Sequence, residues 1–144
     1  MSCSTRDGLN FDAIVSDPVP PCGGNWTQFG VHCYKYFGER LSWYDAQARC
    51  EQEGGHLTSI HSAEENLFVT SLQPKDSARD SGIWIGGNDI DTEGIWEWTD
   101  GSTWNFQIWR YGEPNAAFIN EDCADLGGSD APCNREMAFI CKRT

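Results

Sequence analysis

The sequence contains few basic residues and no long apolar run. Its 144 residues include 10 Lys and Arg against 22 Asp and Glu, which gives a formal net charge of −12. Between Asp80 and Asp130 the only base is Arg110, among eleven acids. This balance disfavours a nucleic-acid partner, because phosphate binding needs the opposite charge, and it favours a cation-binding second half. No apolar run approaches the ~18 residues of a membrane span, so none is expected.

Motifs of common enzyme and zinc-site classes are also absent. The chain has no GxSxG, no HExxH and no CxxC, and its three histidines form no matching ligand pair. Glu113 and Glu121 would be the candidates for an acid–base pair, but no pattern around them favours catalysis. We therefore expect a binding protein and not an enzyme.

Cysteine, in contrast, is abundant. Seven cysteines in an acidic, Trp-rich chain indicate disulfides and an oxidising compartment. Asn25-Trp26-Thr27 is an N-glycosylation sequon, which agrees with secretion. No apolar h-region follows Met1, so the first residues do not form a signal peptide, and we expect that a leader was removed. The predicted location is secreted and extracellular.

The pattern of residues predicts a tail and one α+β domain. Residues 1–21 are polar and end in a proline-rich segment, so they are expected to form an N-terminal tail, and the domain covers residues 22–144. Residues 22–36 predict a β-hairpin around Gly30 that a Cys22–Cys33 disulfide would fasten.

Two helices are predicted next, each from a capping box. Ser42 to Asp45 begins the first helix, which ends at Gly54-Gly55, and Ser62 to Glu65 begins the second, which ends before Pro74. The buried faces are predicted from residues spaced three or four apart, which are Trp43, Ala46 and Cys50 in the first helix and Leu67, Phe68 and Leu72 in the second.

Short strands and long loops are predicted after the helices. Strands are expected at IWIGG (83–87), at IWEWTDG (95–101) and at MAFICK (137–142). Between Trp98 and Met137 the sequence predicts one weak strand at most, near residues 123–126. An irregular stretch of this length inside a small domain is usually functional. The near match of residues 89–100 to an EF-hand loop is rejected, because an EF-hand needs helices on both sides.

Several motifs in order resemble the C-type lectin domain over about residues 22–143. They are WIGG at 84–87, GIWEWTDGS at 94–102, W-x-x-GEPN at 109–115, EDC at 121–123, D-x-PC at 130–133 and FIC at 139–141. The resemblance implies the C-type lectin fold, with two helices, small antiparallel sheets and a long disulfide-stapled loop region. It also implies three disulfides, Cys50–Cys141, Cys123–Cys133 and Cys22–Cys33. Cys3 is left over, and we expect it either to link two chains as a homodimer or to remain a free thiol.

The resemblance implies a Ca²⁺ cofactor and a carbohydrate partner at the acidic loop. The implied metal ligands are Glu113, Asn115, Glu121 and Asp130, whose oxygens suit a hard cation and leave positions for two neighbouring sugar hydroxyls. The same carboxylates would accept hydrogen bonds from these hydroxyls, and the Asn115 amide would donate one. Similar lectins have a cis bond before Pro114, and EPN goes with mannose, fucose or GlcNAc.

One motif departs from the family pattern. Where members usually carry WND, this chain has Gly128-Ser129-Asp130, so Ser129 replaces a ligating Asn with only a hydroxyl. Calcium binding would then be weaker and sugar orientation altered, and stacking of the sugar on Trp109 or Trp104 keeps galactose as an alternative.

An auxiliary metal site of some members corresponds to Asp89, Glu93, Glu121 and Asp122, but it is incomplete because Ala116 replaces an acid. Trp84, Trp96 and Trp98 are predicted to be core residues. The expected role is recognition or agglutination of microbial or other cell-surface glycans, as in innate immunity. The alternatives are a calcium-independent protein-binding module and a type II antifreeze-like protein.

Overall fold

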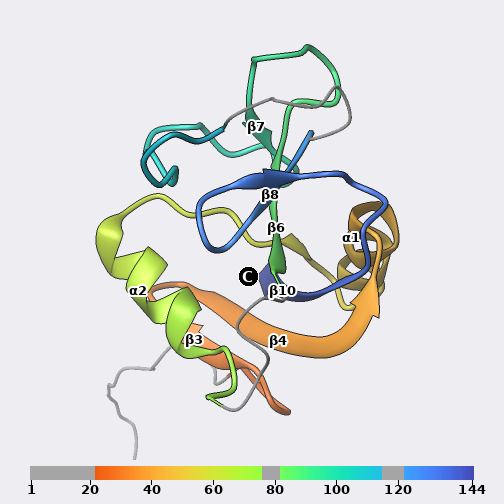
Figure 1. The fold of residues 1–144 in the computed structure, drawn as a ribbon. Coiled ribbons are helices and arrows are strands. Elements are labelled where there is room, and N and C mark those ends of the chain that lie inside the picture. The colour runs from red at the N-terminus through yellow and green to blue at the C-terminus, as the bar shows by residue number, and fades with distance from the viewer. Residues whose placement is uncertain (1–21, 76–81, 115–121) are drawn as a thin grey trace, which may run out of the picture.

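Within the residues that the structure describes, the protein folds around one mixed sheet with two helices (Figure 1). A computed structural model describes residues 22–75, 82–114 and 122–144. The helices are α1 (Trp43–Gln52) and α2 (Ala63–Ser71). The strands are β3 (Thr27–Phe29), β4 (His32–Leu41), β5 (His56–Leu57), β6 (Ile83–Asn88), β7 (Glu97–Trp98), β8 (Cys123–Asp125), β9 (Asp130–Ala131) and β10 (Met137–Arg143).

Strand β10 lies at the centre of the sheet. The strand order is β3-β4-β10-β6-β8-β9, with β5 paired to β10 and β7 paired to β6. The β10–β6 pair is parallel and the other pairs are antiparallel. The expected α+β architecture with two helices is therefore confirmed among the described residues, but the strands expected in small separate sheets join into one. In Figure 1 the loops around β7 lie at the opposite end of the molecule from β3 and β4.

Both predicted helix starts are confirmed by their caps. The Ser42 hydroxyl accepts a hydrogen bond from the Asp45 amide at 3.1 Å, and the Ser62 hydroxyl accepts one from the Glu65 amide at 3.0 Å. These bonds satisfy amides that have no partner inside the helix. None of the helices in the described part of the chain has the length and hydrophobicity needed to cross a membrane.

The buried face is confirmed for α1 and partly wrong for α2. In α1 the residues Trp43, Ala46 and Cys50 are buried, as predicted. In α2 Phe68 and Leu72 pack against the core, but Leu67 is 73% exposed. The fully covered positions are instead Glu65 and Val69, four residues apart. Leu67 lies midway between them and points to the other side of the helix, since the helix turns about 100° per residue.

The described part of the loop region contains a strand, β9, that the sequence analysis did not predict. Strand β8 occupies the predicted position, and β9 returns along it, with Ala124 opposite Asp130. A two-residue strand gives no alternating pattern that a sequence can display. The three predicted disulfides, Cys22–Cys33, Cys50–Cys141 and Cys123–Cys133, are all present. Cys3 and the tail of residues 1–21 lie outside the described residues.

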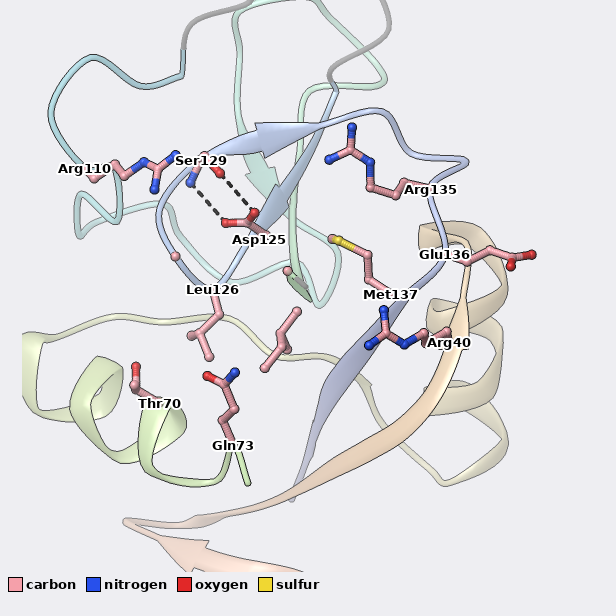
Figure 2. Close-up of a pocket in the computed structure, with 13 residues that line it drawn as sticks. Arg40, Thr70, Gln73, Arg110, Asp125, Leu126, Ser129, Arg135, Glu136 and Met137 are labelled. Atoms are coloured by element: carbon pink, nitrogen blue, oxygen red, sulfur yellow. Dashed lines mark hydrogen bonds between the residues drawn. The ribbon is translucent and has the colours of Figure 1, made fainter. Parts of the chain in front are cut away.

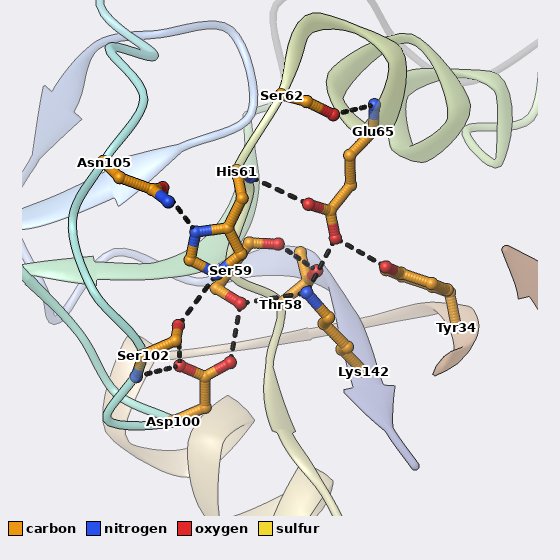
Figure 3. Close-up of polar contacts among 10 residues, drawn as sticks. All are labelled: Tyr34, Thr58, Ser59, His61, Ser62, Glu65, Asp100, Ser102, Asn105 and Lys142. Carbon is orange, nitrogen blue, oxygen red and sulfur yellow. Dashed lines mark hydrogen bonds and ion pairs between the residues drawn. The ribbon is translucent and has the colours of Figure 1, made fainter. Parts of the chain in front are cut away.

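A buried ion pair joins α2 to the central strand (Figure 3). Lys142 of β10 donates to Glu65 Oε2 at 2.7 Å, and both residues are buried. Glu65 also accepts from the Tyr34 hydroxyl at 2.5 Å and from the His61 amide at 2.8 Å. Burial alone would raise the pKa of Glu65, but the hydrogen bonds from Lys142, Tyr34 and His61 outweigh it and hold the pKa below its ordinary value. A charge buried in this way is stabilising only while its partners remain.

Replacing Glu65 is expected to destabilise the fold strongly. The Glu65→Gln variant leaves the Lys142 ammonium buried without a counter-charge, and such a loss costs about 3–5 kcal/mol. Because the folded-state pKa of Glu65 is lowered, its contribution is present above the ordinary value of 4.5 and is lost as the pH falls through the folded-state value. Urea unfolding at neutral pH and at acid pH measures both effects.

Glu64→Gln is the matched control, because Glu64 is an exposed neighbour in the same first turn of α2. It is expected to change the free energy of unfolding by less than about 0.5 kcal/mol. Equal losses in the two variants would contradict a special role for the Glu65–Lys142 pair.

Candidate functional site

Three acidic side chains meet where β6 ends and β8 begins. Asn88 of β6 lies opposite Cys123 of β8, which brings the flanking residues Asp89 and Asp122 side by side. The Asp89 amide donates to the Asp122 carbonyl at 3.0 Å. Glu93 joins them from the following loop, and carboxylate oxygens of the three residues lie within 4.8 Å of one another. The predicted auxiliary residues Asp89, Glu93 and Asp122 are thus brought together.

The electrostatics of this acidic cluster, Asp89, Glu93 and Asp122, are unfavourable without a cation. Asp89 is only 2% exposed, and within the described residues its Oδ1 atom has no hydrogen-bond partner, whereas Oδ2 accepts from the Gly94 amide at 2.8 Å. Burial raises the pKa of Asp89, and the nearby Asp122 adds to this rise against the effect of the Gly94 amide. The charge of Asp89 in turn raises the pKa of Glu93. A hard cation would relieve this repulsion and would take up the unpaired oxygen, so the residues fit calcium.

The predicted main site is described only in part. Glu113 and Pro114 are described and the bond between them is cis, as the resemblance implied. Glu113 is held by its amide, which donates to the Arg110 carbonyl at 3.0 Å, and its carboxylate lies 3.9 Å from the Arg110 guanidinium. Asn115 and Glu121, the two other ligands implied near this segment, lie outside the described residues.

Ser129 and Asp130, two further residues of the predicted main site, lie in the loop that the Cys123–Cys133 disulfide closes. The Ser129 hydroxyl donates to Asp125 Oδ2 at 2.9 Å, and its amide donates to Asp125 Oδ1 at 3.2 Å. Asp130 begins β9 and is buried. The Ser129 side chain is thus engaged by Asp125 in this structure. A calcium-ligand role for Asp130, and for Ser129, stays a prediction.

Gly128 positions the loop that leads to Glu113. Its φ is 86°, and a Cβ atom there would lie 2.6 Å from the Ile108 carbonyl oxygen and 2.8 Å from the Arg110 nitrogen. The Arg110 amide donates to the Gly128 carbonyl at 3.0 Å. The loop backbone therefore rests directly on this glycine, at the position where the family pattern has Trp. Sequence reasoning treated this position only as a departure from WND, although the glycine itself was the signal of a close backbone approach.

Four tryptophans form a continuous row beside the loops. Trp98 stacks on Trp104 at a centroid distance of 4.3 Å, and Trp104 stacks on Trp109 at 5.9 Å. Trp96 meets Trp109 edge-to-face at 4.7 Å. Trp84 and Trp98 are buried as predicted, and Trp96 is half-buried against the core. Trp109 contacts the rings of Trp96 and Trp104. A sugar could therefore stack only on the part of the Trp109 ring that these two contacts leave uncovered.

A polar cavity of about 600 Å³ lies on the Ser129 side of the β8–β9 hairpin (Figure 2). Asp125 is in its wall, and Arg40, Arg110 and Arg135 stand around it. Burial raises the pKa of Asp125, and the hydrogen bonds from Ser129 act against that rise. No pattern in the sequence indicates this cavity, because its lining comes from six separate segments, at residues 40, 70–73, 82–83, 110, 125–129 and 135–137.

Comparisons with known proteins agree with the geometry. The model of the "Lectin C-type domain" family matches residues 39–143. A galactose-specific lectin, nattectin from Thalassophryne nattereri, is 32% identical over 148 residues, covering 99% of this chain and 91% of the lectin.

Two solved structures share the fold. The cow C-type carbohydrate-recognition domain of CD23, crystallised in the presence of a GlcNAc2Man3 oligosaccharide, has a TM-score of 0.76 and 36% identity, covering 85% of this chain and 95% of that one. A calcium-independent type II antifreeze protein has a TM-score of 0.77 and 31% identity, covering 85% and 94%. The family model matches most of this chain, the two solved structures share its fold, and the three expected disulfides are present. This chain therefore belongs to the C-type lectin domain family.

Proposed function

We propose that the protein is a secreted lectin that binds carbohydrate in a calcium-dependent way. The observation that carries this proposal is the buried Asp89 carboxylate, which has one oxygen without a hydrogen-bond partner among the described residues and two acidic neighbours. In its ionised form such a group is costly unless a cation neutralises it. The acidic cluster therefore favours calcium at the loop end of the molecule.

The sugar would bind at the EPN segment. Glu113, Asn115, Glu121 and Asp130 would hold the ion, with Ser129 as a further candidate. When bound, calcium supplies coordination positions that two neighbouring sugar hydroxyls complete. The carboxylates of Glu113 and Glu121 accept hydrogen bonds from these hydroxyls, and the Asn115 amide donates one. This division of roles requires both acids and amides in one short loop.

The proposed sugars are mannose, fucose or GlcNAc, which the EPN motif favours. The cow CD23 domain, crystallised in the presence of a mannose-containing oligosaccharide, is consistent with this class. Galactose is the alternative to these sugars. Nattectin is called galactose-specific, and in this chain Ser129 replaces a ligating Asn while Trp109 offers a ring on which galactose could stack. We propose recognition of cell-surface glycans, including microbial ones, as the biological role. A Cys3–Cys3 homodimer would strengthen it, because two linked sites bind a repeating glycan with higher avidity.

Two other functions are set against this proposal. A calcium-independent protein-binding module would not need the acidic cluster, and an ice-binding protein would present flat Thr-rich surfaces. The ice-binding function is considered because the chain is similar in structure to a calcium-independent type II antifreeze protein. The acidic, tryptophan-lined loops favour a polar ligand and a cation instead.

A glycan array run with calcium and with EDTA tests the proposed function. We expect binding to mannose-type glycans with calcium and its loss in EDTA, because the ion carries part of the ligand contact. Binding that survives EDTA would contradict the calcium bridge, and an empty array combined with ice shaping under the microscope would favour the antifreeze function.

Asp89→Asn is expected to remove most of the stabilisation by calcium. Calcium at 100 times its Kd should stabilise the native protein by about 2.7 kcal/mol. In EDTA the variant should be at least as stable as the native chain at neutral pH, because a repelling charge is gone. This gain should vanish below pH 3.8, since the raised pKa of Asp89 penalises folding only above its ordinary value. Thermal unfolding with calcium and with EDTA measures both.

Asp91→Asn is the matched control for Asp89→Asn, because Asp91 is exposed on the same loop. It should keep the full calcium response. If Asp89→Asn responded to calcium as strongly as the native chain, the acidic cluster would not be a cation site.

Gly128→Ala is expected to weaken calcium and sugar binding at the EPN segment. The added Cβ meets backbone atoms of residues 108 and 110 and occupies a positive φ, which costs on the order of 1–3 kcal/mol. The loop that carries Glu113 must then shift. Calorimetric titrations with calcium, and with sugar in the presence of calcium, measure the loss of affinity. Near-ultraviolet circular dichroism checks that the variant keeps its fold.

Gly127→Ala is the control for Gly128→Ala, since its Cβ would meet only Asp125 Oδ1 at 3.4 Å and Gly127 is exposed. It should bind sugar like the native chain. Equal binding by Gly128→Ala and Gly127→Ala would show that Gly128 does not position the loop.

A further inference from the structure

Asn25 is held on the surface by a tight turn at the start of the domain. The Trp26 amide donates to the Gly23 carbonyl at 3.2 Å, and Gly23 and Gly24 both have positive φ values, 78° and 54°. Cys22, immediately before the turn, is fixed by its disulfide to Cys33 of β4. Asn25 and Thr27 are both exposed. The turn thus displays a fixed and accessible amide.

The middle residue of the Asn25-Trp26-Thr27 sequon points into the protein and anchors the segment. The Trp26 ring packs against the core cluster and meets Phe37 edge-to-face at 6.2 Å. The Arg143 guanidinium lies 3.9 Å from the centroid of the Trp26 ring. With Trp26 held inward, Asn25 and Thr27 on either side of it stay turned to solvent. No other asparagine in the sequence is followed by Ser or Thr two positions later.

A groove begins at the sequon. Its volume is about 320 Å³, and its lining consists of Asn25, Thr27, Tyr34, Lys35, Tyr36 and Leu72. Tyr34 is only 1% exposed, so the half-buried Tyr36 ring is the aromatic surface, and together with the polar side chains around it this ring suits the apolar face and hydroxyls of a saccharide. A sugar attached to Asn25 would therefore find a surface to lie on.

Among the described residues, the sequon lies on the outermost strand of the sheet. Within that part of the chain, strand β3 ends the strand order and pairs only with β4, and Thr27 is its first residue. An unprotected edge strand offers free backbone groups to the edge of another molecule. A bulky hydrophilic group at this position would block such pairing.

We propose that Asn25 is an N-glycosylation site whose glycan lies over this groove and shields the β3 edge. The donor is an oligosaccharide linked through a diphosphate to a lipid carrier. Asn25 Nδ2 forms the new bond to the anomeric carbon of the sugar, the bond from that carbon to the diphosphate oxygen breaks, and the Nδ2 proton passes to a base. The lipid diphosphate leaves, and no oxidant or reductant is needed. The inference rests on the proposed secretion, because this donor belongs to the secretory pathway.

The glycan would leave the calcium-dependent site open. Strand β3 and the loops around β7 lie at opposite ends of the molecule in Figure 1, and the acidic cluster belongs to the loop end. A glycan at Asn25 is therefore attached at the end of the molecule away from the acidic cluster. Modification and ligand binding can be measured separately.

The test is the secreted full chain made in a eukaryotic host with a cleavable leader. We expect the peptide that contains Asn25 to carry a glycan, and peptide N-glycosidase to remove it and convert Asn25 to Asp. Thr27→Ser keeps the sequon and should retain the glycan, whereas Asn25→Gln and Thr27→Ala should lose it. Protein from which the glycan has been removed without unfolding should self-associate at a lower concentration than the glycosylated form. Sedimentation velocity measures this difference.

Unmodified Asn25 in the secreted protein, while a reporter glycoprotein from the same cells is modified, would overturn the assignment. Equal self-association of the glycosylated and deglycosylated forms would overturn the edge-shielding role. Neither readout depends on calcium or sugar binding, so a failed glycan array would leave this result unaffected. Failure of the chain to be secreted behind a working leader would contradict the secretion on which the inference rests.

Discussion

The Cys50–Cys141 disulfide joins α1 to the central strand β10, and the rest of the fold is assembled around that junction. Strand β10 pairs with β4, β5 and β6, so it connects the N-terminal hairpin to the loop half of the molecule. The Lys142–Glu65 pair fastens α2 to the same strand. These contacts hold β6 and β10, the strands that border the long loop region, in one frame.

The fixed frame brings like charges together at the loop end. Strands β6 and β8 set Asp89 beside Asp122, and the loop after β6 adds Glu93. Burial of Asp89 makes this arrangement costly, which is tolerable for a site that a cation completes. Gly128 contributes to the predicted main site, which is separate from the acidic cluster, by letting the loop before Glu113 lie against the β8–β9 hairpin.

Much of the fold followed from local sequence signals. The capping serines Ser42 and Ser62 determine where the helices begin, and the ordered family motifs identified the disulfides and the cis bond before Pro114. The failures have a common cause, which is tertiary context. Leu67 is exposed because Glu65, an acid, takes the buried face through its bond to Lys142, and a hydrophobic pattern cannot anticipate a buried ion pair. Strand β9 is too short to leave a pattern, and the backbone contact at Gly128 joins segments about twenty residues apart. Of the main site, Glu113, Ser129 and Asp130 are described, and the predicted ligand roles stay predictions.

The most direct test of the central claim is a calorimetric titration of the intact, oxidised chain with calcium, followed by a titration with mannose. The account predicts heat of calcium binding at millimolar calcium or below, and sugar binding only after calcium has been added. Absence of any calcium heat, with the disulfides confirmed by mass spectrometry, would contradict it.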